Sequence, residues 1–158
     1  MVFDRRIVRR TRSGDFELRL PPTERAVLRE VLPQLKAALQ GDASAEPAFK
    51  RLFPVAYAQD PEHEAEYRAL VGDELTATRI GHVDTVLTTL DASTLSEEQV
   101  FAWMGAVNDL RLVLGTRLDV SEETDLDVDP SHPDAAAFAL YAYLGWLLEL
   151  LVEAAAAT

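Results

Sequence analysis

The chain has 158 residues, with 15 basic and 27 acidic side chains and a formal net charge of -12. This length is typical of one domain, and 48% hydrophobic residues suffice for a buried core, which excludes a wholly disordered chain. The acidic balance argues against a general nucleic-acid binder, and the absence of cysteine excludes disulfides, thiol catalysis and thiolate metal sites within this chain. We therefore expect a single domain over residues 1–158.

The first twenty residues predict a β-hairpin. Two β-prone segments, residues 2–12 and 15–20, flank a Ser-Gly turn signal. A two-residue loop at that signal would set Arg10 opposite Glu17 as an opposite-charge cross-strand pair. A lone hairpin is only marginally stable in water, so we expect its apolar face to pack on helices.

Arginines are concentrated in this hairpin. The first twelve residues carry a net charge of +4, so the remaining residues carry -16. Three explanations stay open: an edge strand whose charges discourage pairing with other sheets, a contact with nucleic acid, or docking to an acidic protein surface. The candidate partner-binding residues are Arg5, Arg6, Arg9 and Arg10.

Apolar residues at helical spacing predict the rest of the fold. Long helices are expected over residues 22–39, 60–90, 96–118 and 133–153, with a short helical turn near residues 48–53. The short connections favour antiparallel neighbours. The predicted fold class is thus mainly α, with an N-terminal β-hairpin packed on an antiparallel helical bundle of four to five helices.

Two of the predicted helices carry irregularities. Pro33 lies inside the first helix and should kink or split it, because proline removes one backbone hydrogen bond and clashes with the preceding turn. In the 60–90 helix the apolar stripe is rotated between the two halves. Either that helix contacts two neighbours in turn, or Gly72 or Gly81 marks a bend.

The loop at residues 119–132 and the helix after it have opposite compositions. Six of the eleven residues from 119 to 129 are acidic and none is basic, so we expect an exposed acidic loop within the bundle of residues 22–158. The last helix is apolar on nearly all sides, but its uncharged run of 14 residues is shorter than the roughly 20 that span a bilayer. We expect no membrane insertion, and a homodimer through this helix.

A charged residue inside an apolar stripe is the main site candidate. The third long helix begins with a capping box at Ser96, and further along Arg111 lies inside its apolar stripe. A covered arginine needs a partner, because burial of a lone charge is costly. We predict an ion pair between Glu74 and Arg111 across antiparallel helices, with Asn108 adding a hydrogen bond. The alternative is a guanidinium offered to an anionic ligand, with Gly115 allowing close approach.

The sequence contains no pattern of a catalytic or metal site. The histidines, His63, His82 and His132, have no ligand spacing, and the acidic loop lacks the glycine and the final glutamate of a calcium-binding loop. Phosphate-loop, dinucleotide-binding, nucleophile and kinase motifs are also absent. We therefore predict a protein that is not an enzyme and that holds no cofactor or metal.

Four segments carry a resemblance to a known family. The most specific is the run Asn108-Asp109-Leu110-Arg111-Leu112-x-Leu114-Gly115-Thr116-Arg117-Leu118. The others are the arginine-rich start with Gly14, the stretch Leu52-Phe53-Pro54-x-Ala56-Tyr57, and Tyr141 with Leu144 in the last helix. On these segments the chain resembles the AosR family of actinobacterial oxidative-stress regulators, long known as a domain of unknown function.

The resemblance implies a cytoplasmic regulator that acts on transcription through a protein partner, with a sigma factor as one such partner and no direct sequence-specific DNA binding. Thiol-based sensing cannot occur in a chain without cysteine, so the protein acts constitutively, senses oxidants through its partner, or has a different role. The alternative function is a small-ligand or anion-binding protein that uses Asn108 and Arg111.

Overall fold

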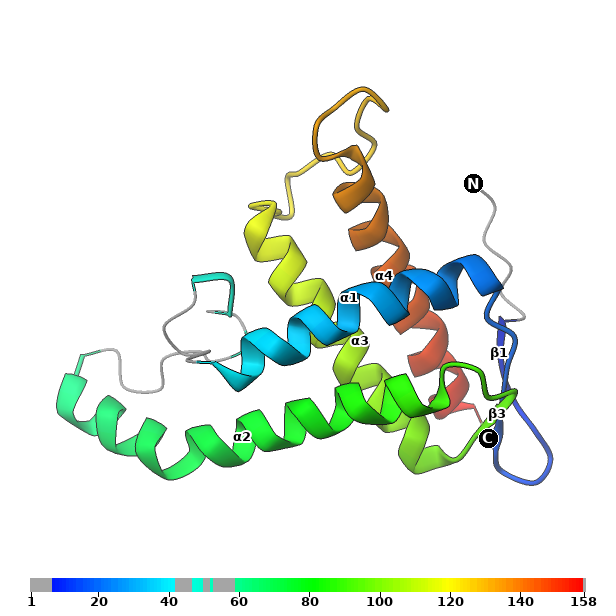
Figure 1. Ribbon diagram of the computed structural model, residues 1–158, viewed down its shortest axis with the longest axis horizontal. Coiled ribbons are helices and arrows are strands. Elements are labelled where there is room, and N and C mark those ends of the chain that lie inside the picture. The colour runs from blue at the N-terminus through cyan, green and yellow to red at the C-terminus, as the bar shows by residue number, and fades with distance from the viewer. Residues whose placement is uncertain (1–6, 42–46, 50–51, 53–58, 158) are drawn as a thin grey trace.

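A computed structural model describes residues 7–41, 47–49, 52 and 59–157 (Figure 1). In chain order the elements are β1 (Val8–Arg10), β2 (Phe16–Leu18), α1 (Pro22–Gln40), the 3-10 turn η3 (Pro47–Phe49), α2 (Pro61–Thr89), β3 (Thr94–Leu95), α3 (Glu97–Arg117) and α4 (Ala135–Ala156). The predicted fold class, a mainly helical protein with an N-terminal hairpin packed on the helices, is confirmed. Of the residues named above, Arg5, Arg6 and residues 53–58 lie outside the described part.

The hairpin forms, but its register differs by one residue from the prediction. Arg10 lies opposite Phe16 rather than Glu17. The loop has three residues instead of two, because the Gly14 amide donates to the Thr11 carbonyl and Gly14 takes a φ of 91°. A turn followed by a residue at positive φ is a common three-residue hairpin loop, and glycine adopts it without steric cost. The extra loop residue therefore places Arg10 on the face of the sheet that Phe16 shares.

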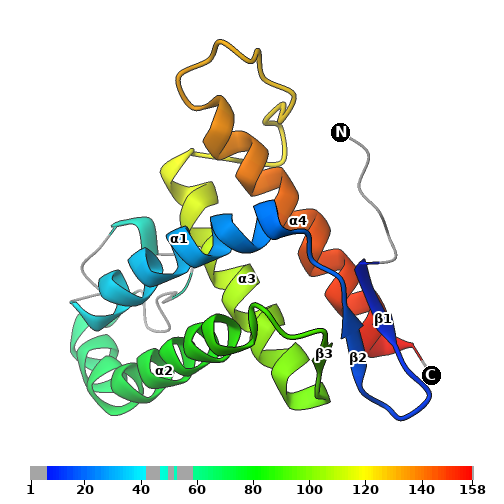
Figure 2. The same ribbon diagram turned by 45° about the vertical axis from the view of Figure 1, so that its right-hand side comes forward.

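A third strand completes the sheet. The two-residue β3 pairs antiparallel with β2, so that Leu95 lies opposite Phe16 and the strand order is β1-β2-β3. Phe16, Leu18 and Leu95 are almost fully buried. Figure 2 shows the sheet beside the carboxyl-terminal end of α4. The hairpin is thus held by a third strand and by helices, as its low intrinsic stability requires.

Helix α1 runs unbroken through Pro33, so the expected split does not occur. Pro33 is exposed, whereas the leucines of the opposite face are buried. On an exposed face water can bond to the carbonyl that proline leaves free, which makes the lost hydrogen bond tolerable. The buried residues of the helix are Leu28, Leu32, Leu35 and Leu39.

Helix α3 is the centre of the bundle. It packs against α2 on one side and α4 on another, and most of its circumference is buried. The predicted capping box is confirmed: the Gln99 amide donates to the Ser96 hydroxyl, and the Ser96 amide donates to the Gln99 side chain. The Trp103 indole is fully buried and donates to the Thr89 hydroxyl at 2.8 Å, which joins α3 to the end of α2.

Helix α4 is long and apolar enough to cross a membrane by length and composition alone. That test is weak evidence, because a helix in the core of a soluble protein passes it too. Here α4 packs on α3 and on β1, and 39% of its most apolar stretch is buried. Tyr143, Leu144 and Leu147 are among the buried residues, so one side of α4 belongs to the core of the bundle.

Candidate functional site

An ion pair joins α2 to α3 inside the protein. Asp109 on α3 is only 2% exposed, and its Oδ1 atom accepts a hydrogen bond from the guanidinium of Arg79 on α2. The same guanidinium donates to the carbonyl of Leu52 at 2.9 Å. Arg79 therefore links α2 to α3 and to the backbone of Leu52.

The environment of Asp109 acts on its proton affinity in two directions. Burial raises the pKa of Asp109 above its usual value, because a low-dielectric surrounding disfavours the charged form. The positive charge and the hydrogen bond of Arg79 oppose that rise, and so does His82. Among the described residues, no group donates a hydrogen bond to the other, buried carboxylate oxygen, Oδ2. Asp109 therefore contacts α2 through Oδ1 and is almost fully covered by protein.

His82 occupies a space that a glycine leaves open. A Cβ atom at Gly105 would lie only 2.4 Å from the His82 Nδ1 atom. Gly105 precedes Asp109 by one helical turn, and His82 follows Arg79 by three residues, so the two contacts lie next to each other along the α2–α3 interface. A side chain at position 105 would therefore force His82 out of its present place between the two helices.

The predicted ion pair between Glu74 and Arg111 does not form. Arg111 projects from the side of α3 that faces α4, where its guanidinium carbon lies 5.3 Å from the centre of the Tyr141 ring. Glu74 is exposed on α2, which packs against a different side of α3. The prediction was wrong because Arg111 and α2 lie on different sides of a helix that has neighbours all around it.

Arg111 contacts the ring of Tyr141 in place of the predicted carboxylate. A cation over an aromatic ring contributes about 0.5–2 kcal/mol, depending on how far it is removed from water. Gly145, one turn after Tyr141, makes room for it, since a Cβ atom there would lie 3.4 Å from the Arg111 Nε atom. Arg111 is half-buried in this arrangement and joins α3 to α4.

The other two candidates on α3, Asn108 and Gly115, lie in different environments. Asn108 is half-buried, whereas Gly115 is buried in the last turn. The Gly115 carbonyl accepts a hydrogen bond from the Val120 amide at 2.8 Å, and the Thr116 carbonyl accepts one from the Asp119 amide. With Asp119 at a φ of 53°, these bonds form a helix-ending Schellman motif. Gly115 therefore has a structural role in ending α3.

Arg9 and Arg10, the two described arginines among the partner-binding candidates, make contacts within the protein. Arg9 pairs with Glu17 at 2.8 Å, and the Arg10 guanidinium donates to the Ala157 carbonyl at 2.8 Å and lies over the Phe16 ring. A cation at the end of α4 is favourable, because the carbonyl end of a helix carries partial negative charge. A role of Arg9 and Arg10 in binding a partner stays a prediction.

The carboxylate of Glu17 is also stabilised in its charged form. A hydrogen bond from Arg19, together with the charges of Arg19 and Arg9, lowers the pKa of Glu17 below its usual value. Both guanidiniums are exposed to solvent, so these pairs contribute little to stability. The charged outer face of the sheet fits the explanation of a solvated edge strand.

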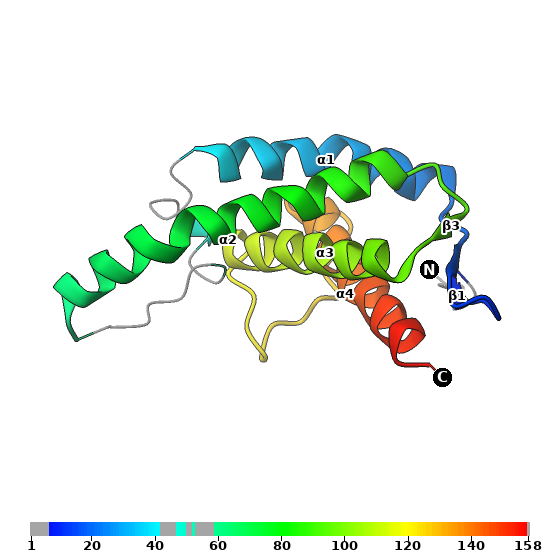
Figure 3. The ribbon, with the colours of Figure 1, turned by 90° about the horizontal axis from the view of Figure 1, so that it is seen from below.

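The first half of α2 projects beyond the other helices. Figure 3 shows this end of α2 extending past α1 and α3. Leu70 is 81% exposed, and Tyr67 and Leu75 are close to 40% exposed. The helix is continuous through Gly72 and Gly81, and only its second half packs into the bundle. The rotated apolar stripe therefore reflects an uncovered surface rather than a bend.

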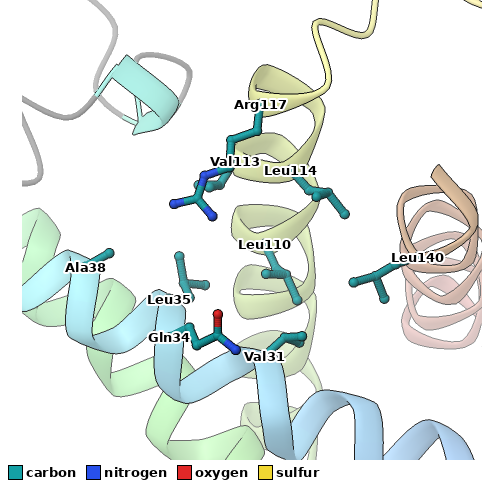
Figure 4. A pocket seen from close by; sticks show the side chains of 9 residues that line it. All are labelled: Val31, Gln34, Leu35, Ala38, Leu110, Val113, Leu114, Arg117 and Leu140. Atoms are coloured by element: carbon teal, nitrogen blue, oxygen red, sulfur yellow. The ribbon is translucent and has the colours of Figure 1, made fainter. Parts of the chain in front are cut away.

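Two adjoining cavities lie along α1. The first has a volume of about 390 Å³ and is enclosed by α1, α3 and α4 (Figure 4). The second, about 560 Å³, lies between α1 and the start of α4. Leu140 lines both. We call the two together the α1–α4 groove. Its other lining residues are Thr23, Glu24, Val27, Val31, Gln34, Leu35, Ala38, Leu110, Val113, Leu114, Arg117, Ala136, Ala137, Ala139 and Tyr143.

Neither a metal centre nor an obvious catalytic group occurs in these places. Within the described ranges, no group of three or more His, Asp or Glu side chains is arranged to hold a metal ion. Arg111 lines neither cavity of the α1–α4 groove. The polar side chains described above make contacts between helices, and the walls of the α1–α4 groove are largely apolar.

A pattern of small residues in the sequence could have indicated the Arg79–Asp109 pair, although the pattern of large apolar residues does not. Ala102, Gly105 and Ala106 precede Asp109 and form a face of small residues, which marks the close approach of a second helix. A charged residue on such a face requires a partner from the approaching helix. No comparable local pattern indicates the α1–α4 groove, because its walls come from distant parts of the chain.

The profile of a family described as a domain of unknown function, DUF2017, matches residues 5–155. The chain belongs to the DUF2017 family. The match includes every helix and strand except the last residue of α4, so the fold described above is the fold of this DUF2017 domain. No solved structure matches the chain significantly.

Named relatives agree with this assignment and confirm the resemblance to the AosR family. The oxidative stress regulator AosR of Mycobacterium leprae is 31% identical over 146 residues, which cover 82% of this chain and 67% of the relative. The oxidative stress regulator AosR of Mycobacterium tuberculosis is 32% identical over 124 residues, 68% of this chain and 57% of the relative. The chain thus aligns with between 57% and 67% of these proteins. Their names support a regulatory role.

Proposed function

We propose that this DUF2017 protein is a non-enzymatic regulator in the oxidative-stress response, which acts on transcription in the cytoplasm by binding a protein partner. The regulatory part of this proposal is supported by the names of the relatives. A sigma factor is the first partner to test. Because the chain has no cysteine, the proposal assigns the redox-sensitive step to the partner.

The observation that carries the proposal is the uncovered apolar surface on the first half of α2. Leu70 is the most exposed large hydrophobic residue, and Tyr67 lies on the same side one turn earlier. Exposed apolar surface framed by charged residues is typical of a protein-binding site. Glu66 and Asp73 lie one turn on either side of Leu70 and are both exposed, so the partner surface should be apolar and basic.

The alternative function, an anion site at Asn108 and Arg111, receives no support from the geometry. An anion-binding guanidinium would face a cavity, whereas Arg111 lies over Tyr141 and makes a contact between two helices. The alternative stays a prediction.

The proposal is tested by affinity capture of the tagged protein from the organism that encodes it, with and without peroxide. We expect a sigma factor or an RNA polymerase subunit to be recovered, and the Leu70→Asp variant to recover much less of it. Phe101→Asp is the matched control, because Phe101 is also exposed, at 52%, but lies on α3. Recovery of neither component under either condition would contradict the proposal.

The homodimer expected through α4 is a separate question. Sedimentation of the purified protein at several concentrations measures it directly. A single monomeric species at micromolar concentration would contradict the expectation, whereas partner binding through α2 would be unaffected by that result.

A further inference from the structure

The α1–α4 groove is apolar along most of its length. Between α1 and the start of α4, the walls are formed by Val27 and Leu140 together with three alanines. Alanines leave space where larger side chains would fill the gap between two helices. The lining residues of α1 extend from Thr23 to Ala38, which corresponds to about 22 Å at the rise of an α-helix. The groove therefore offers an apolar surface of this length, which suits an extended apolar chain.

Among the described residues that line the groove, one is a cation, and it lies at one end. Figure 4 shows the side chain of Arg117 reaching from the last turn of α3 into the space between α3 and α1. Within the part of the chain that the structure describes, no carboxylate forms an ion pair with Arg117. Its guanidinium is thus available to an anionic group that enters the groove, and a guanidinium binds a carboxylate through two parallel hydrogen bonds.

The other end of the groove is unfavourable for an anion. Glu24 lines that end, beside Tyr143. Burial and the neighbouring Glu24 raise the pKa of the Tyr143 phenol, which stays protonated. The negative charge of Glu24 repels a second carboxylate there, so the two ends of the groove differ in sign. This difference fixes the direction in which a molecule with one charged end would lie.

We propose that the α1–α4 groove binds a long-chain carboxylic acid, with its carboxylate on Arg117 and its hydrocarbon chain between α1 and α4. The cavity volumes, about 390 and about 560 Å³, lie within the range of roughly 300–1,000 Å³ that is usual for ligand sites. The cation at one end and the apolar walls along the rest suit a molecule with one anionic end and an apolar chain. This site is independent of the α2 surface that carries the proposed function.

Fluorescence titration of the purified chain with cis-parinaric acid, a fluorescent fatty acid, tests the proposal. We expect saturable binding at one site, displacement by palmitate, and about tenfold weaker displacement by methyl palmitate, which lacks the negative charge. The Arg117→Gln variant should bind palmitate about tenfold more weakly and methyl palmitate unchanged. Arg12→Gln, at an exposed arginine of the hairpin loop, is the matched control and should bind like the parent.

A second pair of variants tests the apolar part of the groove. Ala137→Trp would fill the space between α1 and α4 and should abolish binding of the probe. Ala26→Trp introduces the same side chain at an exposed position of α1 that does not line the groove, and should leave binding unchanged. Circular dichroism confirms that each variant is folded. Absence of saturable binding, normal binding by Ala137→Trp, or equal displacement by palmitate and its methyl ester would overturn the proposal.

Discussion

The two halves of α2 belong to one continuous helix but lie in opposite environments. In the second half Val83 and Val86 are fully buried, whereas in the first half Leu70 is 81% exposed. Both halves carry apolar residues at helical spacing. Such spacing therefore identifies a helix. It does not show whether the apolar side of that helix faces the core or an exposed binding surface.

The boundary between the two halves is marked by polar contacts. Arg79 pairs with Asp109 and bonds to the Leu52 carbonyl at the point where α2 enters the bundle, and His82 packs on Gly105 directly after it. A buried charge pair aligns two helices more strictly than leucines would, because a small shift leaves the charges uncompensated. Variants at this boundary and on either side of it test the comparison.

The largest effect is expected from Asp109→Ala. Removing the carboxylate leaves the Arg79 guanidinium in a largely buried place without its counter-ion, which should lower the free energy of unfolding by about 3–5 kcal/mol. Urea denaturation measures the change. The double variant Asp109→Ala with Arg79→Met should recover much of the loss, because no buried charge remains unpaired. A loss of under about 1 kcal/mol in the single variant would show that the pair does not hold the helices together.

The next effect concerns the close approach of α2 and α3. Gly105→Ala places a Cβ atom against His82, and such overpacking lowers the free energy of unfolding by about 1–3 kcal/mol. The higher helix propensity of alanine offsets up to about 1 kcal/mol of this loss. Gly72→Ala is the control in the projecting half, where a Cβ atom meets nothing within 4 Å. That substitution should stabilise the protein by about 0.5–1 kcal/mol. Equal effects at both positions would contradict the contact.

The effect of the conservative variant Asp109→Asn on the free energy of unfolding should depend on pH. Because burial raises the pKa of Asp109 above its ordinary value of 3.8, the folded protein holds this proton to higher pH than the unfolded chain does. The contribution of the group to stability is then fully present below pH 3.8 and declines as the pH rises through the raised pKa. The stability difference between parent and variant should therefore shrink with rising pH. A difference that grows would mean that Arg79 outweighs burial.

The smallest effect on folding is expected in the projecting half. Leu70→Ser removes an exposed side chain and should change the free energy of unfolding by less than about 0.5 kcal/mol. The same variant should reduce capture of the partner strongly. Thermal denaturation and the capture experiment together separate the two roles. A large loss of stability would place Leu70 in the folded core and would end its assignment to a binding surface.

Local signals predicted the elements of the fold well. The capping box at Ser96 and Gln99 is complete within four residues, so nothing distant could change it. The hairpin was likewise visible from its turn signal and flanking β-prone segments. Its register was not, because a Ser-Gly pair fits loops of two or three residues, and one residue more exchanges the faces of a strand.

Local sequence patterns did not predict the contacts between helices. The sequence shows that Glu74 and Arg111 are charged residues on helices, but it does not show which side of α3 faces α2. That depends on how the neighbouring helices pack around α3. The face of small residues before Asp109 was the better guide, since it records the distance between two helices rather than hydrophobicity. The groove could not be predicted, because α1 and α4 are about a hundred residues apart in sequence and leave it open where they diverge.

The bond from Arg10 to the Ala157 carbonyl has a consequence for the order in which the protein folds. The ribosome synthesises the hairpin before α4, the helix against which β1 packs. Until α4 emerges, the apolar side chain of Val8 in β1 lacks part of the surface that covers it and is accessible to chaperones. The hairpin therefore reaches its final arrangement only after α4 has been translated.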